Sequence, residues 1–193
     1  MYRCENMSFK YRNWVFRECS VDVEAPKIGL TGKNGCGKTT FLKLLDRQLT
    51  PQEGRIGTDG STYLVDFDMA AYKAFWLDDI VRLCSSLRSF DTTSASEKIE
   101  QLHLAEYTQT PIGELSKGTV RKVSLLIGLM STADILLLDE PFESIDEDSN
   151  NNLTTMLSQR LGAHVIVSHD RTTLRQCVDA TWTIENACLK EVE

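Results

Sequence analysis

The sequence has no apolar run that approaches the roughly 20 residues a helix needs to cross a bilayer. Its first residues, Met1 to Glu5, also lack the apolar core of a secretion signal. These absences predict a soluble cytoplasmic chain that would need a partner protein for any role at a membrane.

Basic residues are in the minority, because Lys and Arg total 21 against 28 Asp and Glu and the net charge is -7. A chain with this balance has no general attraction for a polyanion, so direct binding of nucleic acid is not expected. The small basic group Lys117, Arg121 and Lys122 is interpreted as a solvated helix face.

Cysteine pairs at metal-binding or redox spacing are also missing. The six cysteines show neither a C-x-x-C pair nor a His/Cys metal spacing, and they are Cys4, Cys19, Cys36, Cys84, Cys177 and Cys188. This scatter predicts free thiols in a reduced intracellular protein. A length of 193 residues suits one α/β domain with a small inserted lobe, and is too short for two nucleotide-binding domains in tandem.

The strongest motif is the stretch from Gly32 to Thr40, which satisfies G-x-x-x-x-G-K-[ST] in full. An apolar run at 28–30 predicts a strand before it, and 40–45 has the spacing of a helix that should end before Pro51. Backbone N–H groups of such a loop surround an anion, and the helix adds its positive N-terminal end. The predicted phosphate-binding residues are Gly32, Asn34, Gly35, Cys36, Gly37, Lys38, Thr39 and Thr40.

The segment after the loop changes from strands to helices. Residues 61–65 predict a strand, whereas Trp76, Ile80, Leu83 and Leu87 recur at helical intervals within 70–90 and predict a buried stripe. A second helix is expected to end near Ala105. We therefore interpret residues 68–112 as a helical lobe inserted into an α/β core.

The rest of the chain alternates helices and buried strands. A largely apolar helix covers about 120–130, and the strands 135–138 and 164–167 deliver Asp139-Glu140 and His169 at their carboxyl ends. A helix at 147–161 separates them. A short helix over 171–178 and a strand at 181–184 close the chain. His103 and His164 match no motif and are interpreted as structural.

The order of these motifs resembles the ATP-binding cassette (ABC) ATPase family over essentially the whole chain. The resemblance implies a P-loop NTPase core of α/β class with an N-terminal antiparallel β subdomain and an inserted helical subdomain. Residues 1–67 and 113–193 would form the core with its β subdomain, and 68–112 the helical lobe, in a single ABC ATPase domain.

The family's site residues carry over position by position and imply binding of ATP with Mg²⁺. Thr39 and Asp139 resemble the Mg²⁺ partners, and Lys38 the lysine on the outer phosphates. Glu140 resembles the general base for the attacking water, and His169 the switch histidine at the γ-phosphate.

A second group of residues implies that two chains form one site. Leu115 to Thr119 is similar to the family signature, in which Ser116 and Gly118 would bind the γ-phosphate held by the other protomer of a homodimer. The stretch Glu143 to Asp146 is similar to the D-loop that lines this interface. Tyr11 is the first candidate for the aromatic that stacks on adenine, and Trp14 the second.

Three positions depart from the family pattern. Asp66 stands where the Q-loop glutamine is expected; it could ligate Mg²⁺ but adds negative charge beside the triphosphate. Lys117 replaces the first signature glycine, a variant of small exporter-type cassettes, and Thr119 replaces the usual glutamine.

The resemblance favours an ATPase subunit of an ABC transporter, held on the cytoplasmic face of the membrane by a separate permease. Aromatic surface for docking would come from Phe67, Tyr72, Phe75 and Trp76. The alternatives are a soluble ABC ATPase that acts on a macromolecular complex, and a weakly catalytic, nucleotide-gated interaction module.

Overall fold

The chain folds into two compact units, and the computed structural model describes residues 2–192. The first unit consists of residues 2–64, 134–140 and 160–192, and the second of Val65–Ala133 and Pro141–Gln159. The second unit thus includes the segment 68–112, for which an inserted lobe is predicted, and also residues 113–133 and 141–159. No helix in the described part of the chain has the length and apolar character required to span a bilayer.

The first unit contains a small antiparallel sheet with the strand order β2-β1-β4. Its strands are β1 (Tyr2–Lys10), β2 (Trp14–Val23) and β4 (Glu53–Thr58). Around the end of β2, charged Asp22 and Glu24 alternate with Val21 and Val23, and Val23 is buried. Phe16 of β2 is fully buried and its ring lies 6.0 Å from that of Phe41.

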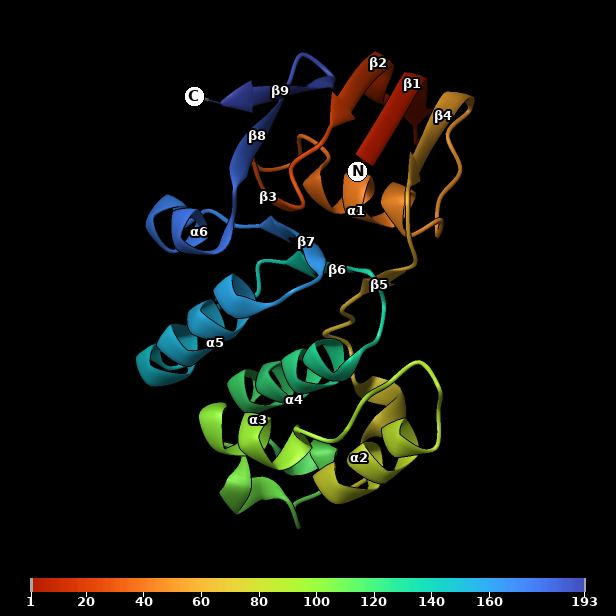
Figure 1. The fold of residues 1–193 in the computed structure, drawn as a ribbon. Helices are drawn as coiled ribbons and strands as arrows, with labels where there is room; N and C mark the ends of the chain where they lie inside the picture. Colours follow the sequence, from red (N-terminus) through yellow and green to blue (C-terminus); the bar gives the residue numbers. More distant parts are fainter. Residues whose placement is uncertain (1, 193) are drawn as a thin grey trace. The chain divides into compact units, whose positions relative to one another are not determined.

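The larger sheet of this unit has the order β5-β6-β7-β3-β8-β9 (Figure 1). All neighbours are parallel except β8 and β9. The strands are β3 (Lys27–Thr31), β5 (Thr62–Leu64), β6 (Ile135–Asp139), β7 (Ala163–Val167), β8 (Ala180–Glu185) and β9 (Cys188–Val192). Because β6, β7 and β3 are consecutive and parallel, their carboxyl ends lie at one edge of the sheet. Strand β9 was missing from the sequence prediction.

Two helices belong to the first unit. Helix α1 (Lys38–Leu45) buries Phe41, Leu42, Leu44 and Leu45 in the core shared with both sheets. It begins at the predicted motif and ends before Pro51, as predicted. Helix α6 (Arg171–Cys177) packs on β3, and Asp170 caps it by accepting the backbone N–H groups of Thr172 and Thr173 at 2.9 and 3.1 Å.

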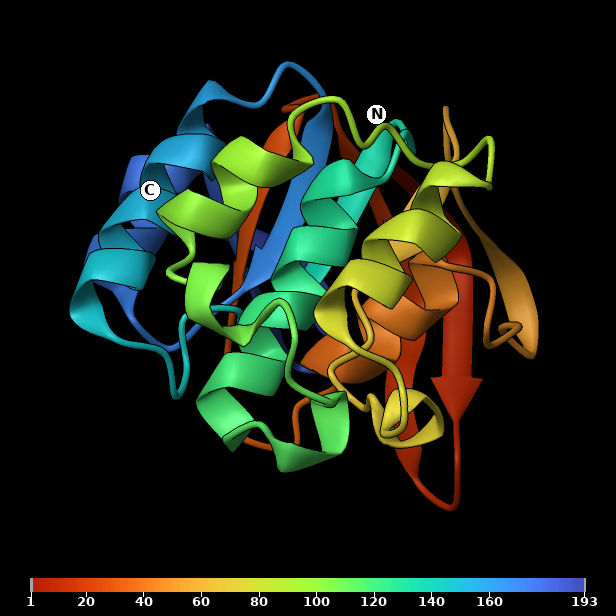
Figure 2. The ribbon, with the colours of Figure 1, turned by 90° about the horizontal axis from the view of Figure 1, so that it is seen from below.

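The second unit is helical. It contains α2 (Leu77–Ser85), α3 (Ala95–Gln101), α4 (Lys117–Met130) and α5 (Glu147–Gln159), with short 3₁₀ turns at Ala70–Tyr72, Ala105–Tyr107 and Ile112–Glu114. Figure 2 shows α2, α3 and α4 packed side by side. Val123, Leu126 and Met130 of α4 form the centre of this core.

The predicted stripe within 70–90 is wrong in its register. Helix α2 begins at Leu77 and buries Leu77, Ile80 and Cys84, whereas Trp76 and Leu83 are 44% and 41% exposed. The carboxylate of Asp79 accepts the backbone N–H of Trp76 at 3.2 Å, and this capping contact starts the helix one residue after the tryptophan. The buried face is therefore rotated by about one residue from the predicted one.

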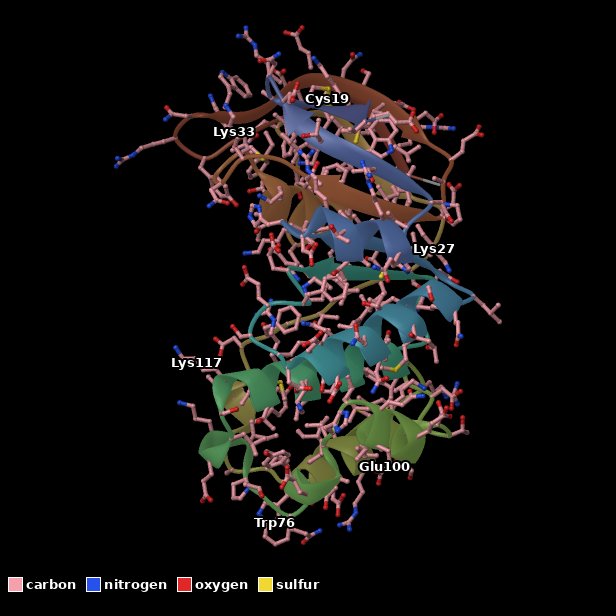
Figure 3. The ribbon with its side chains drawn as sticks, turned by 90° about the vertical axis from the view of Figure 1, so that its left-hand side faces the viewer. Cys19, Lys27, Lys33, Trp76, Glu100 and Lys117 are labelled. Carbon is pink, nitrogen blue, oxygen red and sulfur yellow. A yellow bond between two sulfur atoms is a disulfide. The ribbon has the colours of Figure 1, made fainter. Side chains whose placement is uncertain are left out.

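The prediction that all six cysteines are free is wrong for two of them. Cys19 of β2 and Cys188 of β9 form a disulfide with a Cα–Cα distance of 5.0 Å (Cys19 is labelled in Figure 3). These residues are 169 positions apart and become neighbours only when β9 pairs with β8. Cys4, Cys36, Cys84 and Cys177 are free.

His164 of β7 predicts a pH dependence of stability. The side chain is fully buried, and one ring nitrogen lies 2.7 Å from the carbonyl of Cys177. Burial lowers the pKa of His164 to about 4, against about 6.5 for an exposed histidine. Between these two pKa values the unfolded chain binds a proton at His164 and the folded chain does not. The free energy of unfolding is therefore highest above about pH 6.5 and falls by up to about 3 kcal/mol as the pH is lowered toward 4.

Urea unfolding at pH 7.5 and 4.5 measures this effect. We expect the His164→Gln variant, whose amide can still donate to the carbonyl, to lose less stability between the two pH values than the unchanged chain. His103→Gln, at an exposed position, is the matched control and should behave like the unchanged chain. Equal pH dependence for His164→Gln and the control would contradict the assignment.

Candidate nucleotide-binding site

The loop 32–37 joins β3 to α1 and forms a glycine-rich cradle. Gly32, Gly35 and Gly37 have φ angles of 144°, 77° and 113°, in the left-handed region that favours glycine. At Gly37, which precedes the first turn of α1, an added Cβ would lie 2.5 Å from Cγ1 of Val15. The loop therefore closes tightly against the β subdomain only with glycine at this position.

Lys38 places a cation inside this cradle. Its side chain is 9% exposed, and Nζ donates to the carbonyl oxygens of Gly32 at 3.0 Å and Lys33 at 3.4 Å. The ammonium group thus lies within the loop, beside the N-terminal end of α1. This donor set suits phosphate, as the motif predicts.

Thr39 and Asp139 lie together although 100 residues separate them. The hydroxyl of Thr39 donates to Oδ2 of Asp139 at 2.5 Å, since β6 ends beside the start of α1. A hydroxyl and one carboxylate suit Mg²⁺ that takes its remaining ligands from phosphate and water. Within residues 2–192 the structure shows no cluster of three or more His, Cys, Asp or Glu side chains that could hold a metal without such help.

Glu140 and His169 also meet at this edge of the sheet. Oε2 of Glu140 accepts the backbone N–H of His169 at 3.1 Å, and Oε1 lies 3.2 Å from Nε2 of its ring. The Glu140 side chain is 16% exposed and that of His169 is 52% exposed. Glu140 has a φ of 51°, an unfavourable value for a non-glycine residue, and its N–H donates to the carbonyl of Val167 at 2.9 Å. The backbone therefore fixes the carboxylate beside the histidine.

Two cavities adjoin the loop. One of about 590 Å³ is lined by Gly32, Lys33, Cys36 and His169 among others, and Lys33 is labelled in Figure 3. The other, of about 470 Å³, is lined by Tyr11, Trp14, Gly35 and Cys36. Cys36 lines both, so they meet at the loop. Both candidates for the adenine-stacking aromatic lie in the second cavity, and the choice between them stays a prediction.

The sequence prediction missed one wall of this second cavity. Asn186 and Ala187 line it from the two-residue turn between β8 and β9, with φ angles of 51° and 60°. Such values at both positions define a type I′ hairpin turn. The carbonyl of Ala187 accepts the N–H of Arg17 at 3.1 Å, which fastens the turn to β2. The sequence signal for this turn is Asn186, which lies between two short apolar runs.

The signature residues belong to the second unit. Ser116 caps α4, because its hydroxyl accepts the N–H of Thr119 at 3.1 Å and lies 2.8 Å from the Thr119 hydroxyl. Thr119, which departs from the family pattern, therefore holds the serine in place. Asp66 accepts the N–H of Asp68 at 2.8 Å and also lies in this unit. Its role as a metal ligand stays a prediction.

The basic group of α4 is not the solvated face that was predicted. Lys122 is buried, and the guanidinium of Arg121 lies 4.0 Å from the centre of the Phe67 ring. Lys117, at the start of the helix, is exposed (Figure 3). Sequence periodicity could not separate these three neighbours, because burial of a lysine depends on its partner.

Comparison with known proteins identifies relatives for the whole chain. Residues 17–143 match the family described as ABC transporter. The ribosome protection protein VmlR of Bacillus subtilis is 35% identical over 96% of this chain and 31% of its own length. The ATP-binding protein ZnuC of the B. subtilis high-affinity zinc uptake system is 24% identical over 89% of this chain and 84% of its own length. The chain spans about a third of the length of the first curated relatives that it matches.

Solved structures share the fold. The dimeric ATP-binding cassette MJ0796, in a post-hydrolysis state bound to ADP and Pi, superposes with a TM-score of 0.84 at 17% identity. The match covers all of this chain and 98% of the other. The predicted fold class, a P-loop ABC cassette with an antiparallel β subdomain and a helical subdomain, is therefore confirmed.

Proposed function

Because the chain belongs to the ABC transporter family of ATPases, we propose that it binds ATP at the loop 32–40 and hydrolyses it with Glu140 as general base. One observation carries this proposal: Lys38, the Thr39–Asp139 pair and the Glu140–His169 pair lie in one unit, at the carboxyl ends of β3, β6 and β7. Phosphate-binding, metal-binding and proton-accepting groups would then face one substrate.

Lys38, Glu140 and His169 would each have a separate role in the reaction. Lys38 would turn its ammonium group from the loop carbonyls toward the β- and γ-phosphates. Glu140 would accept a proton from the water that attacks the γ-phosphorus, while the bond to the β-phosphate oxygen breaks and ADP leaves. His169, 3.2 Å from the Glu140 carboxylate, would hold that water in line.

Mg²⁺ would be held by the Thr39 hydroxyl and the Asp139 carboxylate, and when bound it neutralises part of the charge on the phosphates. Asp66 is proposed as a further ligand or as a charge that weakens metal binding.

We further propose that two copies form a head-to-tail homodimer around two ATP molecules. Ser116 and Gly118 of one copy would complete the phosphate site of the other, as the family pattern implies. The dimeric state of the cassette MJ0796 supports this arrangement.

We propose two classes of partner that would use the energy of ATP hydrolysis. The first is a macromolecular complex such as the ribosome, which the 35% identity to a ribosome protection protein favours. The second is a membrane permease, which an exposed aromatic surface favours. Tyr72, Phe75 and Trp76 are 38%, 41% and 44% exposed. Backbone hydrogen bonds from Ile112 and Gly113, both 2.9 Å, hold the segment that carries them.

Copurification from cells distinguishes these partners. We expect a tagged Glu140→Gln chain, loaded with ATP, to bring down ribosomal particles if the first candidate is correct. Detergent extraction would instead recover a polytopic membrane protein if the second is correct. A Trp76→Ser variant should lose the partner only if the aromatic surface is the docking site. Failure to recover either partner with a Glu140→Gln chain that binds ATP would contradict both candidates.

A further inference from the structure

Lys122 is a buried cation that the proposed reaction does not use. It lies in the middle of α4 with a side chain that is 9% exposed. Nζ donates to Oδ2 of Asp146 at 3.0 Å and lies 3.4 Å from the hydroxyl of Ser149. Taking an ammonium group out of water costs free energy unless it is paired and hydrogen-bonded, so its position is fixed by this carboxylate.

Asp146 is itself held in one orientation. Its two oxygens accept the N–H of Ser149 at 2.8 Å and the Ser149 hydroxyl at 2.9 Å, and its carbonyl accepts the N–H of Asn150 at 2.9 Å. Burial opposes ionisation, but the hydrogen bonds from Ser149 and Lys122 keep the pKa of Asp146 well below its usual range. Asp146 is therefore ionised at neutral pH, and its contact with Lys122 holds the start of α5 against α4.

A second contact joins the same two segments one helical turn away. A Cβ added at Gly118 would lie 2.4 Å from the carbonyl oxygen of Ser144, which has a φ of 61°. Gly118 and Lys122 are four residues apart and so share one face of α4. That face meets the stretch 143–146 at two points, a backbone contact at Ser144 and an ion pair at Asp146.

We propose that Lys122 is a positioning residue that couples the stretch 143–146 to the signature residues 116–118, so that both are presented as one surface to the second copy of the chain. The inference rests on the proposed function, in which these two segments face the partner copy and its ATP. The ion pair holds the stretch at the distance from α4 at which Gly118 admits the Ser144 carbonyl.

The geometry indicates which variant tests the coupling without unfolding the unit. Asp146 is 51% exposed, so water can solvate it when the lysine is removed. Removing the aspartate would instead leave the buried ammonium group of Lys122 without its counter-charge. Lys122→Met keeps the apolar length of the side chain, and Lys122→Arg keeps its charge. Arg88→Met, at an exposed site in the same unit, is the control for loss of a positive charge.

Three measurements on the full chain decide the proposal: the Kd for ATP of the monomer, ATP-dependent dimerisation by sedimentation, and kcat. We expect Lys122→Met to bind ATP within about twofold of the unchanged chain, but to dimerise more weakly and to lose about tenfold or more in kcat. Lys122→Arg should recover most of both losses, and Arg88→Met should show neither. Normal dimerisation and kcat in Lys122→Met would overturn the proposal, as would a parallel loss of ATP affinity.

Amide hydrogen exchange tests the coupling separately from the proposed function. We expect faster exchange of the amides of Ser149 and Asn150, which donate to Asp146, for Lys122→Met than for Arg88→Met, at equal thermal stability. Unchanged exchange would overturn the coupling even in a chain that neither dimerises nor hydrolyses ATP. Failure of the unchanged chain to dimerise or hydrolyse would count against the proposed function instead.

Discussion

Replacing Glu140 with glutamine is expected to lower kcat for ATP hydrolysis by about 10²- to 10⁴-fold. The amide has nearly the shape of the carboxylate, and its oxygen can still accept the N–H of His169, which lies 3.1 Å away in the structure. It cannot accept the proton of the attacking water. The chemical step should therefore fail while the fold and the nucleotide site persist.

The consequence for assembly follows from the same geometry. Because ATP would bind and remain intact, the variant should accumulate as an ATP-bound dimer, which sedimentation can detect alongside a phosphate-release assay. Glu147→Gln, exposed in the first turn of α5, is the matched control and should keep normal turnover. A Glu140→Gln chain with unchanged turnover would refute the assignment of the base.

Lys38→Ala is expected to weaken ATP binding by about 10- to 100-fold, the equivalent of one or two charge-assisted hydrogen bonds to phosphate. Lys38 is 9% exposed and its Nζ already donates to a loop carbonyl, so little reorganisation is needed for it to meet the phosphates. Lys33 also lines the adjoining cavity, but Lys38 is the lysine whose Nζ is hydrogen-bonded within the loop, so we expect the loss not to be compensated. Hydrolysis should fall with binding.

Isothermal titration with ATP and with ADP measures the effect. Lys43→Ala changes a lysine on the same helix, in its last turn, and should leave both affinities unchanged. A larger loss for ATP than for ADP would indicate that Lys38 acts mainly on the γ-phosphate. Equal affinities in Lys38→Ala and Lys43→Ala would contradict the assignment of the phosphate site.

Much of the fold and the candidate site could be predicted because the signals are local. The glycines of the loop, the apolar run before it and the helical spacing after it lie within twenty residues of one another. The apolar runs at 135–138 and 164–167 predict buried strands, and the residues that follow the strands of a parallel sheet meet at one edge. Glu140 and His169 are therefore expected to be neighbours, and Oε1 of Glu140 lies 3.2 Å from Nε2 of His169.

The sequence alone determined the family pattern, the order of the elements up to β8 and the residues delivered to the sheet edge, since each depends on neighbouring residues and on period. Only the tertiary structure decided the Cys19–Cys188 disulfide, the cavity wall at Asn186, the buried face of α2 and the partner of Lys122. In each of these cases a side chain's environment is set by a segment that is distant in the chain or by the exact residue at which a helix begins. Hydrophobic periodicity specifies that a face is buried, but contact, charge pairing and bonding depend on which surfaces the packed chain brings together.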